Sequence, residues 1–390
     1  MKAMSGGSLG DLLLRNATAI IFVAVFLFFG LQSLNFFSPE NVGSILKQAS
    51  FTGVIAVGMT FVLLTAGIDL SVGSNMYLSA MAAGYFLQIP AMQNGFGAVL
   101  AIIVGLAAGA LFGAVNGFCI VALRITPFMV TLATLVAGRG LGTAITESFG
   151  LEFPRAYTSI GAWSLVTAPQ TPDGSLLDAI AARIAPLTST PIFIFAVVVF
   201  AAHVALTRTT FGRQIFAVGN DPDGARKAGI DTRRIVFSVY VISGLCSALG
   251  GLMLISLIGR LNQTFGVGKE FEVITASVLG GASLFGGVAT AFGAVIGSVL
   301  VQLVQAGMVF IQVNLYLQPM VLAGIIFLAV FFDSLRGRRL LKLRAVRSSE
   351  SCRRGAACLP HSLNHDPQWQ SAVEIRHRQE RPSIRMGRGS

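Results

Sequence analysis

Long apolar stretches alternate with short polar segments along most of the chain. Ten stretches between residues 17 and 332 are apolar, and nine of them approach the roughly 20 residues that cross a bilayer as a helix. They cover residues 17–34, 42–66, 71–88, 97–121, 128–147, 191–207, 235–258, 271–283, 287–309 and 316–332. The stretch 271–283 is short, so we expect it to be re-entrant or broken. The pattern predicts an all-α polytopic membrane protein with about ten transmembrane helices.

One charged residue interrupts this pattern between two apolar stretches, in LTAGIDLSVGS at residues 64–74. An ionisable group at membrane depth is costly and usually has a function. We expect Gly67 to end one helix in a left-handed conformation and Asp69 to cap a new helix that starts at Leu70, with Ser71 as the other candidate cap. The alternative interpretation, compatible with the first, places Asp69 on a translocation path or a hinge.

Composition supports a bilayer as the solvent. The chain is 54% hydrophobic and 12% charged, whereas soluble domains carry about 25% charged residues. The net charge of +11 does not indicate nucleic-acid binding, because residues 336–390 hold 13 Lys/Arg and 4 Asp/Glu, against 15 and 13 in residues 1–335. The basic tail 336–390 is either a disordered segment near anionic lipid or non-native sequence, and we assign it no function.

The distribution of basic residues also predicts the orientation of the chain in the membrane. We expect residues 1–16 to be cytoplasmic and the first apolar stretch to be an uncleaved helix rather than a signal peptide, because no small-x-small cleavage site follows it. The membrane domain then covers residues 17–335, and both termini are cytoplasmic. The cytoplasmic segment 208–234 is rich in Lys and Arg, whereas the loop 148–190 on the opposite side has mixed charge and several prolines. We expect that loop to contain a short amphipathic helix.

The segment 208–234 contains a second signal, TTFGRQIFAVGNDPDGARKAGI at residues 209–230. Asn220 and Asp221 before Pro222 predict the start of a short helix, and Gly229 predicts its end. An exposed helix held between two membrane helices can receive a push from a partner. The alternative is an ordinary basic loop that satisfies the positive-inside rule.

Several chemistries find no support in the sequence. No G-x-x-x-x-G-K-[ST] motif occurs, and the nearest string, GVGKE at 266–270, lacks the Ser or Thr that holds magnesium. The apolar stretches lack the chains of Asp, Glu and His that form a proton relay. No C-x-x-C pair suggests a metal site. We therefore expect no enzyme activity, cofactor or metal in this chain, so a partner must drive it unless it is a passive pore.

Four stretches carry a family resemblance. GMTFVLLTAGIDLSVGSNM (58–76), NGFCIVALRITPFMVTLATLVAGRG (116–140), residues 209–230 and FEVITASVLGGASLFGGVATAFGAVIG (271–297) resemble the permease subunits of ribose-type monosaccharide importers of the ATP-binding cassette (ABC) class. The likeness runs in order from about residue 40 to about residue 335. It implies the fold of the cobalamin-importer class, a location in the bacterial inner membrane and a second permease copy, identical or paralogous. It also implies a cytoplasmic ATPase that binds ATP and magnesium, and a periplasmic sugar-binding protein.

The resemblance also implies where the ATPase docks. The docking residues map onto Phe211, Gly212, Arg213, Gly219, Asn220, Asp221, Ala225, Arg226 and Gly229. The chain departs from the family at two places. The family often has Gly-Gly-Asn where this chain has only Gly219-Asn220, and it often has Ala near the position of Gly224. A glycine inside this helix weakens it by up to about 1 kcal/mol.

Other polar residues in the apolar stretches are candidates for the path or a hinge. The set is Gly67, Asp69, Ser71, Gly73, Asn116, Arg139, Glu272 and Gln302. For Arg139 we favour pairing with Glu147 or snorkelling, and for Glu272 a helix-start acid. Asn116 and Gln302 either hydrogen-bond between helices or line a path. We expect residues 279–287 to break a helix and pack closely against a partner chain.

Taken together, the sequence predicts a permease subunit of an ATP-driven monosaccharide importer for a ribose- or xylose-like sugar. The rival hypotheses are a stand-alone secondary transporter or facilitator for a small polar solute, and a branched-chain amino-acid permease of the same broad superfamily. The first rival predicts solute uptake by the isolated chain and indifference to deletion of residues 213–230. The leading hypothesis predicts the reverse.

Overall fold

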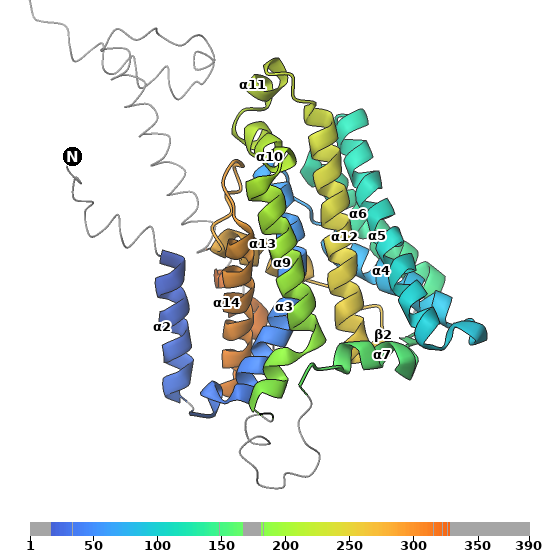
Figure 1. The fold of residues 1–390 in the computed structure, drawn as a ribbon, viewed down its shortest axis with the longest axis vertical. Coiled ribbons are helices and arrows are strands. Elements are labelled where there is room, and N and C mark those ends of the chain that lie inside the picture. The colour runs from blue at the N-terminus through green and yellow to red at the C-terminus, as the bar shows by residue number, and fades with distance from the viewer. Residues whose placement is uncertain are drawn as a thin grey trace, which may run out of the picture. The chain divides into compact units, whose positions relative to one another are not determined.

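The computed structural model describes residues 17–32, 34–147, 149–166, 181, 183–314, 316–321, 323–325 and 327. Contacts divide the chain into two units, Met1–Ser334 and Leu335–Ser390, and every described residue belongs to the first. The predicted tail 336–390 and the predicted N-terminal segment 1–16 lie outside the described residues. The first unit is built from long helices that run side by side (Figure 1).

Six of the described helices are long and apolar enough to cross a membrane. They are α3 (Pro39–Leu64), α5 (Gly95–Ala122), α6 (Pro127–Thr146), α9 (Thr190–Arg208), α12 (Thr232–Ile258) and α14 (Ala291–Phe310). Each coincides with a predicted span. Many of their large apolar side chains are exposed, as expected for a surface that faces lipid.

The other predicted spans give shorter helices. Helix α2 (Ala17–Gln32) and helix α4 (Val72–Leu87) have 16 residues each, and α13 (Lys269–Leu279) has 11. The short α13 agrees with the expectation of a re-entrant or broken segment at 271–283. The predicted span 316–332 is described only in part. Length and composition thus support six of the ten predicted crossings among the described residues.

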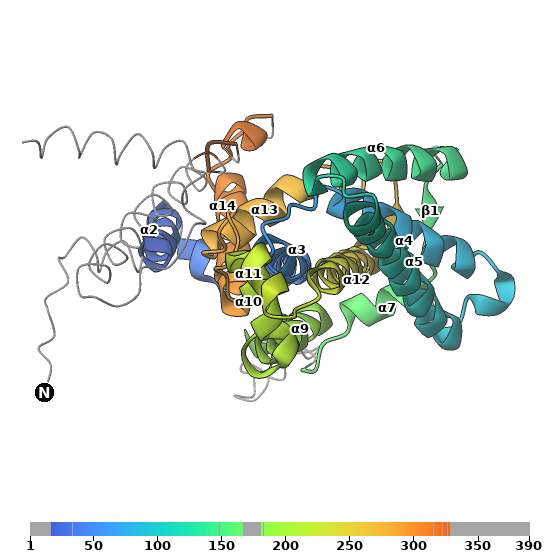
Figure 2. The ribbon, with the colours of Figure 1, turned by 90° about the horizontal axis from the view of Figure 1, so that it is seen from above.

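Helix α3 lies at the centre of the bundle, surrounded by α12, α14, α9 and α13 (Figure 2). In the 18-residue apolar stretch of α3, 83% of the residues are buried. Small residues allow neighbouring helices to approach closely. Between α5 and α12, for example, a Cβ on Gly244 would lie 2.4 Å from the carbonyl oxygen of Gly109. The glycine-rich composition therefore serves helix packing here.

Short elements close the two ends of the bundle. At one end, called the α11 end, lie α10 (Thr210–Asn220) and α11 (Pro222–Lys227). At the opposite end, called the α7 end, lie α7 (Arg155–Ala162) and a two-stranded antiparallel sheet of β1 (Leu151–Glu152) and β2 (Arg260–Leu261). The short 3-10 helices are η1 (Leu34–Phe37), η2 (Pro90–Met92) and η3 (Ala185–Thr188).

Helix α7 is the short amphipathic helix expected in the loop 148–190. Its Tyr157 is buried and donates a hydrogen bond to the carbonyl oxygen of Leu252 in α12, at 3.0 Å. Burial raises the pKa of the Tyr157 hydroxyl above its ordinary value, so it remains a donor. The loop is therefore tied to the bundle at this helix, and residues 167–180 lie outside the described part.

Candidate functional site

The polar segment after α9 folds into two consecutive helices. The side chain of Thr209 caps α10 by accepting a hydrogen bond from the Gly212 amide at 3.1 Å. Asp221 caps α11 by accepting from the amides of Asp223 and Gly224, at 3.1 and 3.0 Å. Gly229 has φ of +84°, the left-handed conformation that ends a helix. The predicted start and end of α11 are therefore confirmed.

Helix α10 was not predicted as a helix. Its buried residues Gly212, Ile215 and Val218 repeat every third position, and Phe211 is partly buried beside them. That spacing marks one face of a helix and is the signal that sequence reasoning missed. The opposite face exposes Arg213.

Among the other predicted docking residues, Ala225 is buried, Gly219 is partly buried, and Asn220, Asp221, Arg226 and Gly229 are exposed. Asn220 uses its side-chain amide to donate to the Phe216 carbonyl at 2.7 Å. The two helices thus present polar groups to the surroundings and bury small or apolar groups.

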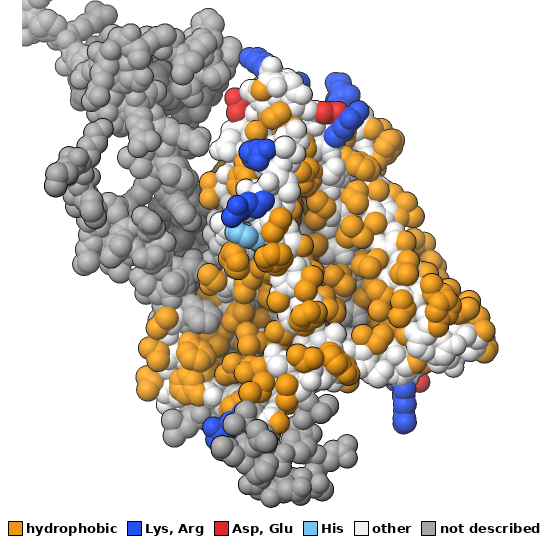
Figure 3. Space-filling model, viewed as in Figure 1, with side chains coloured by type: hydrophobic (Ala, Val, Ile, Leu, Met, Phe, Trp, Pro, Cys, Tyr) orange, Lys and Arg blue, Asp and Glu red, His pale blue; other side chains and the backbone are white. Residues whose placement is uncertain are grey.

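Basic side chains gather at this end of the bundle (Figure 3). The exposed ones are Arg124, Arg208, Arg213, Arg226, Lys227, Arg233 and Arg234. Two of them pair with neighbouring acids, Arg226 with Asp223 at 3.5 Å and Arg234 with Asp231 at 2.9 Å. Both pairs are exposed, so they contribute little to stability. Much of the positive charge is therefore available to a partner or to anionic lipid.

Three backbone segments meet where α10 ends. We call this contact the glycine junction, formed by Leu64–Ala66, Gly219–Asn220 and Gly286–Gly287. The Gly287 amide donates to the Leu64 carbonyl at 3.0 Å. A Cβ on Gly219 would lie 1.8 Å from that same carbonyl oxygen. The end of α3 is therefore in direct backbone contact with the predicted docking segment.

The glycine junction bears on two expectations. Residues 279–287 break a helix, as expected, and Gly286 and Gly287 pack against the end of α3 and against α10 of the same chain, whereas packing of this run against a partner chain stays a prediction. The residue after α3 with a left-handed conformation is Ala66, with φ of +57°, and not Gly67. A Cβ on Gly67 would lie 2.6 Å from the Tyr240 hydroxyl oxygen, so close packing is the reason for glycine there.

Asp69 follows the glycine junction and is 2% exposed. One carboxylate oxygen accepts from the Ser71 amide at 3.0 Å and from the Ser71 hydroxyl at 2.6 Å. The other accepts from the Ser243 hydroxyl of α12 at 2.7 Å. The Asn116 side-chain amide of α5 donates to the Ser71 hydroxyl at 2.8 Å. Asp69 thus joins the α3–α4 segment to α12, and Ser71 joins it to α5.

The expected capping role of Asp69 is correct in part. Asp69 accepts a backbone N–H, but α4 begins at Val72 rather than at Leu70, and the amide it binds belongs to Ser71, the residue before the helix. The Ser71 side chain does not cap α4. Asn116 hydrogen-bonds between helices, which was one of its two open interpretations.

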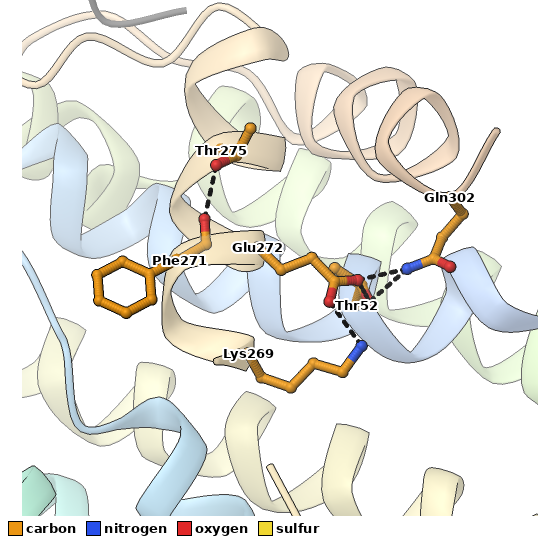
Figure 4. Close-up of polar contacts among 6 residues, drawn as sticks. All are labelled: Thr52, Lys269, Phe271, Glu272, Thr275 and Gln302. Atoms are coloured by element: carbon orange, nitrogen blue, oxygen red, sulfur yellow. Dashed lines mark hydrogen bonds and ion pairs between the residues drawn. The ribbon is translucent and has the colours of Figure 1, made fainter. Parts of the chain in front are cut away.

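A second buried network surrounds Glu272 (Figure 4). One carboxylate oxygen accepts from the Thr52 hydroxyl of α3 at 3.0 Å and from the Gln302 side-chain amide of α14. The other pairs with the Lys269 ammonium at 2.7 Å. Glu272 lies in the first turn of α13, as expected, and also joins α13 to two spanning helices. Gln302 is likewise an interhelical hydrogen-bond donor.

Arg139 of α6 does not pair with Glu147, contrary to expectation. Its guanidinium donates to the carbonyl oxygens of Phe265 and Gln263, at 2.5 and 3.4 Å, and lies 5.4 Å from the centre of the Tyr77 ring. These carbonyls belong to the segment between β2 and α13. Gly73 contacts the same segment, because a Cβ there would lie 2.3 Å from the Gly266 carbonyl oxygen.

The comparisons with known proteins decide the family. Residues 41–330 match the family model described as branched-chain amino acid transport system / permease component. The chain belongs to this permease family. No solved structure matches it. The family and the six apolar helices indicate a multi-pass inner-membrane permease. The resemblance to monosaccharide importer permeases is confirmed by this family together with relatives named for galactose, xylose and ribose.

Three relatives of this permease cover most of its length. It is 32% identical to the galactose/methyl galactoside import permease protein of Salmonella typhimurium, over 82% of this chain and 93% of the relative. It is 32% identical to the xylose transport system permease protein of Escherichia coli K12, over 81% and 91%. It is 33% identical to the ribose import permease protein of Escherichia coli K12, over 77% and 88%.

Proposed function

We propose that this permease forms the membrane path of an ABC importer for a monosaccharide, in the bacterial inner membrane. The observation that carries the proposal is the set of relatives matched over 88% or more of their length, which are named as permease proteins for galactose, xylose and ribose. The family description mentions branched-chain amino acids, but those relatives favour a sugar over an amino acid. The stand-alone transporter is not favoured either, because two relatives are named import permease proteins and the third is named the permease protein of a transport system.

The α11 end faces the cytoplasm in this proposal. Cytoplasmic loops carry an excess of Lys and Arg. Seven exposed basic residues lie at the α11 end, with three exposed acids, whereas positive and negative charges are mixed near α7. The N-terminus is then cytoplasmic, because α2 runs toward α3 from the α11 end (Figure 1).

The cytoplasmic ATPase docks on α10 and α11 and supplies ATP hydrolysis, since this chain carries no nucleotide-binding motif. Its movement reaches the membrane helices through the glycine junction, where Gly219 touches the carbonyl of Leu64. The next link is Asp69, which lies five residues after Leu64 and is hydrogen-bonded to Ser243 of α12. We therefore interpret Asp69 as part of a hinge.

The remaining partners follow from the same proposal. A periplasmic sugar-binding protein docks at the α7 end, on α7 and on Gly259 and Arg260 at the start of the loop 259–270. A second permease copy, identical or paralogous, completes the path, in a fold of about ten helices per subunit similar to that of the cobalamin-importer class.

The docking step is tested by charge reversal. The fused double ATPase is mixed with detergent-solubilised permease, and the bound fraction and ATP hydrolysis are measured for wild type, Arg213→Glu and Arg155→Glu. Both arginines are exposed, one on α10 and one on α7. We expect Arg213→Glu to lose ATPase binding and Arg155→Glu to retain it. Equal binding by both variants contradicts docking on α10.

A further inference from the structure

Two short helices begin at the same place inside the bundle. The first turn of α4 contains Gly73, and the first turn of α13 contains Glu270. A Cβ on Gly73 would lie 2.3 Å from the Gly266 carbonyl oxygen and 2.5 Å from the Glu270 carboxylate oxygen Oε2. The N-termini of the two helices therefore face each other, and both bring the positive end of a helix dipole.

This meeting point lies near the middle of the spanning helices. The Asn75 side chain of α4 donates to the Gly244 carbonyl of α12 at 3.2 Å. Gly244 is twelve residues after the start of α12 at Thr232 and fourteen before its end at Ile258. Helix α4 ends where the Gln88 side chain donates to the Glu152 carbonyl at the α7 end, and the segment after α13 reaches the glycine junction, so the two short helices run toward opposite ends of the bundle.

The segment 262–268 must then descend from the α7 end to mid-membrane. It has no regular helix or strand, and Gly266 and Gly268 have φ of +75° and +79°. Irregular backbone at membrane depth occurs only where it is buried in protein or lines a water-filled cavity. Asn262, Gln263 and Thr264 are exposed, so this segment faces water or a second permease copy rather than lipid.

Glu270 is the group at this point with unused hydrogen-bonding capacity. It is 7% exposed, and its Oε2 is buried without a hydrogen-bond partner. Glu272, two residues further along α13, has both oxygens bonded. A buried carboxylate oxygen left without a donor is costly, and in native structures such an atom calls for an explanation.

Arg139 supplies a complementary donor. Its guanidinium donates to the Phe265 carbonyl, and the next residue, Gly266, meets Gly73 beside the Glu270 oxygen. A guanidinium has five N–H groups, and one nitrogen of Arg139 holds the carbonyls of Gln263 and Phe265. The carboxylate can accept further hydrogen bonds, and the guanidinium can donate further ones. Together they suit a ligand with several hydroxyls, because each hydroxyl both donates and accepts.

We propose that Glu270 and Arg139 form a hydroxyl-binding position for the transported sugar at the meeting point of α4 and α13. The proposal rests on the proposed sugar-import function and names residues for it. In the described conformation the Glu270 Oε2 is buried beside Gly73, which packs against Gly266, so sugar contact requires the segment 262–268 to move away from α4. The position therefore opens during the transport cycle.

The test uses the full complex of permease, ATPase and binding protein in proteoliposomes. Uptake of galactose, xylose and ribose, and ATP hydrolysis, are measured for wild type, Glu270→Gln and Glu270→Ala, with Glu147→Gln as an exposed control. A lost hydrogen bond to a charged group predicts uptake roughly 10-fold slower or more in both Glu270 variants. ATP hydrolysis and Glu147→Gln uptake stay unchanged. Uptake by both Glu270 variants at the wild-type rate overturns the inference.

A second readout separates sugar contact from a purely structural role. Wild type and Glu270→Ala are compared on the transported sugar and its monodeoxy analogues. A site that binds a hydroxyl rejects the analogue that lacks it, so wild type discriminates against one analogue and Glu270→Ala does not. Equal discrimination by the two proteins overturns the inference. If wild type transports none of the three sugars, the proposed function fails instead.

A further measurement tests the proposal even if the Glu270 variants do not fold. Asn262→Cys is treated with a membrane-impermeant thiol reagent in the assembled complex, and the labelled peptide is identified by mass spectrometry. Labelling at this position supports an aqueous path along the segment 262–268. An unlabelled Asn262→Cys overturns it, because the segment is then closed to water and to sugar.

Discussion

Replacing Gly219 by alanine tests the glycine junction. The new Cβ would lie 1.8 Å from the Leu64 carbonyl oxygen and 2.9 Å from the Gly287 amide nitrogen. Both atoms belong to the backbone, so no side-chain rotation relieves the contact. The segments must separate by more than 1 Å to reach an ordinary contact, and the 3.0 Å hydrogen bond from Gly287 to Leu64 is strained or lost.

The size of the effect follows from three contributions. Overpacking costs about 1–3 kcal/mol, and the lost hydrogen bond about 1 kcal/mol. Alanine in place of glycine inside α10 returns up to about 1 kcal/mol of helix stability. We expect a net destabilisation of about 1–3 kcal/mol, because the overpacking and hydrogen-bond terms exceed the helix term. The α10–α3 contact should therefore open while α10 itself stays helical.

The assay measures stability and coupling together. The unfolding midpoint of purified permease and the ratio of sugar taken up to ATP hydrolysed are determined for Gly219→Ala and for Gly140→Ala. Gly140 is the matched control, since a Cβ on it meets nothing within 4 Å. We expect Gly219→Ala to lower both quantities with ATPase binding retained, and Gly140→Ala to lower neither. If Gly219→Ala takes up as much sugar per ATP hydrolysed as wild type, the glycine junction does not transmit movement from the ATPase.

Three further substitutions probe the other contacts. Asp69→Ala leaves the Ser243 hydroxyl without its partner, so we expect a destabilisation of about 1–3 kcal/mol. An unchanged denaturation midpoint would show that the Asp69 carboxylate does not stabilise the fold. Glu272→Ala leaves the Lys269 ammonium unpaired, and we expect a loss of about 3 kcal/mol in the same measurement, larger than for Glu272→Gln. Gly229→Ala places a side chain on a residue with φ of +84°, so we expect the permease to lose about 1 kcal/mol of stability and to bind the ATPase more weakly. Wild-type affinity for the ATPase in a titration would show that the turn at Gly229 has no role in docking.

Much of the fold could be predicted because the bilayer imposes a simple pattern. Each of the six long helices coincides with an apolar stretch. Helix α11 could be placed because its capping residues are local: Asp221 binds amides two and three residues away, and Gly229 lies two residues after the last residue of the helix. Signals of this kind depend on neighbouring residues alone, so the sequence contains them in full.

The contacts of the site could not be predicted, because they join distant parts of the chain. Arg139 reaches carbonyls more than 120 residues away, and no local spacing distinguishes those from the nearby Glu147. The left-handed residue after α3 was assigned to Gly67 because glycine favours that conformation. Ala66 adopts it instead, and Gly67 is small because Tyr240 packs against it.

The direct test of the account is sugar uptake by the reconstituted permease with and without its ATPase. Permease in proteoliposomes is supplied with sugar-loaded binding protein, and uptake is followed with ATPase and ATP present, with ATPase absent, and with Arg213→Glu permease. We predict saturable uptake only in the first case. Saturable uptake by the permease alone, unchanged in Arg213→Glu, would contradict a path driven through α10 and α11.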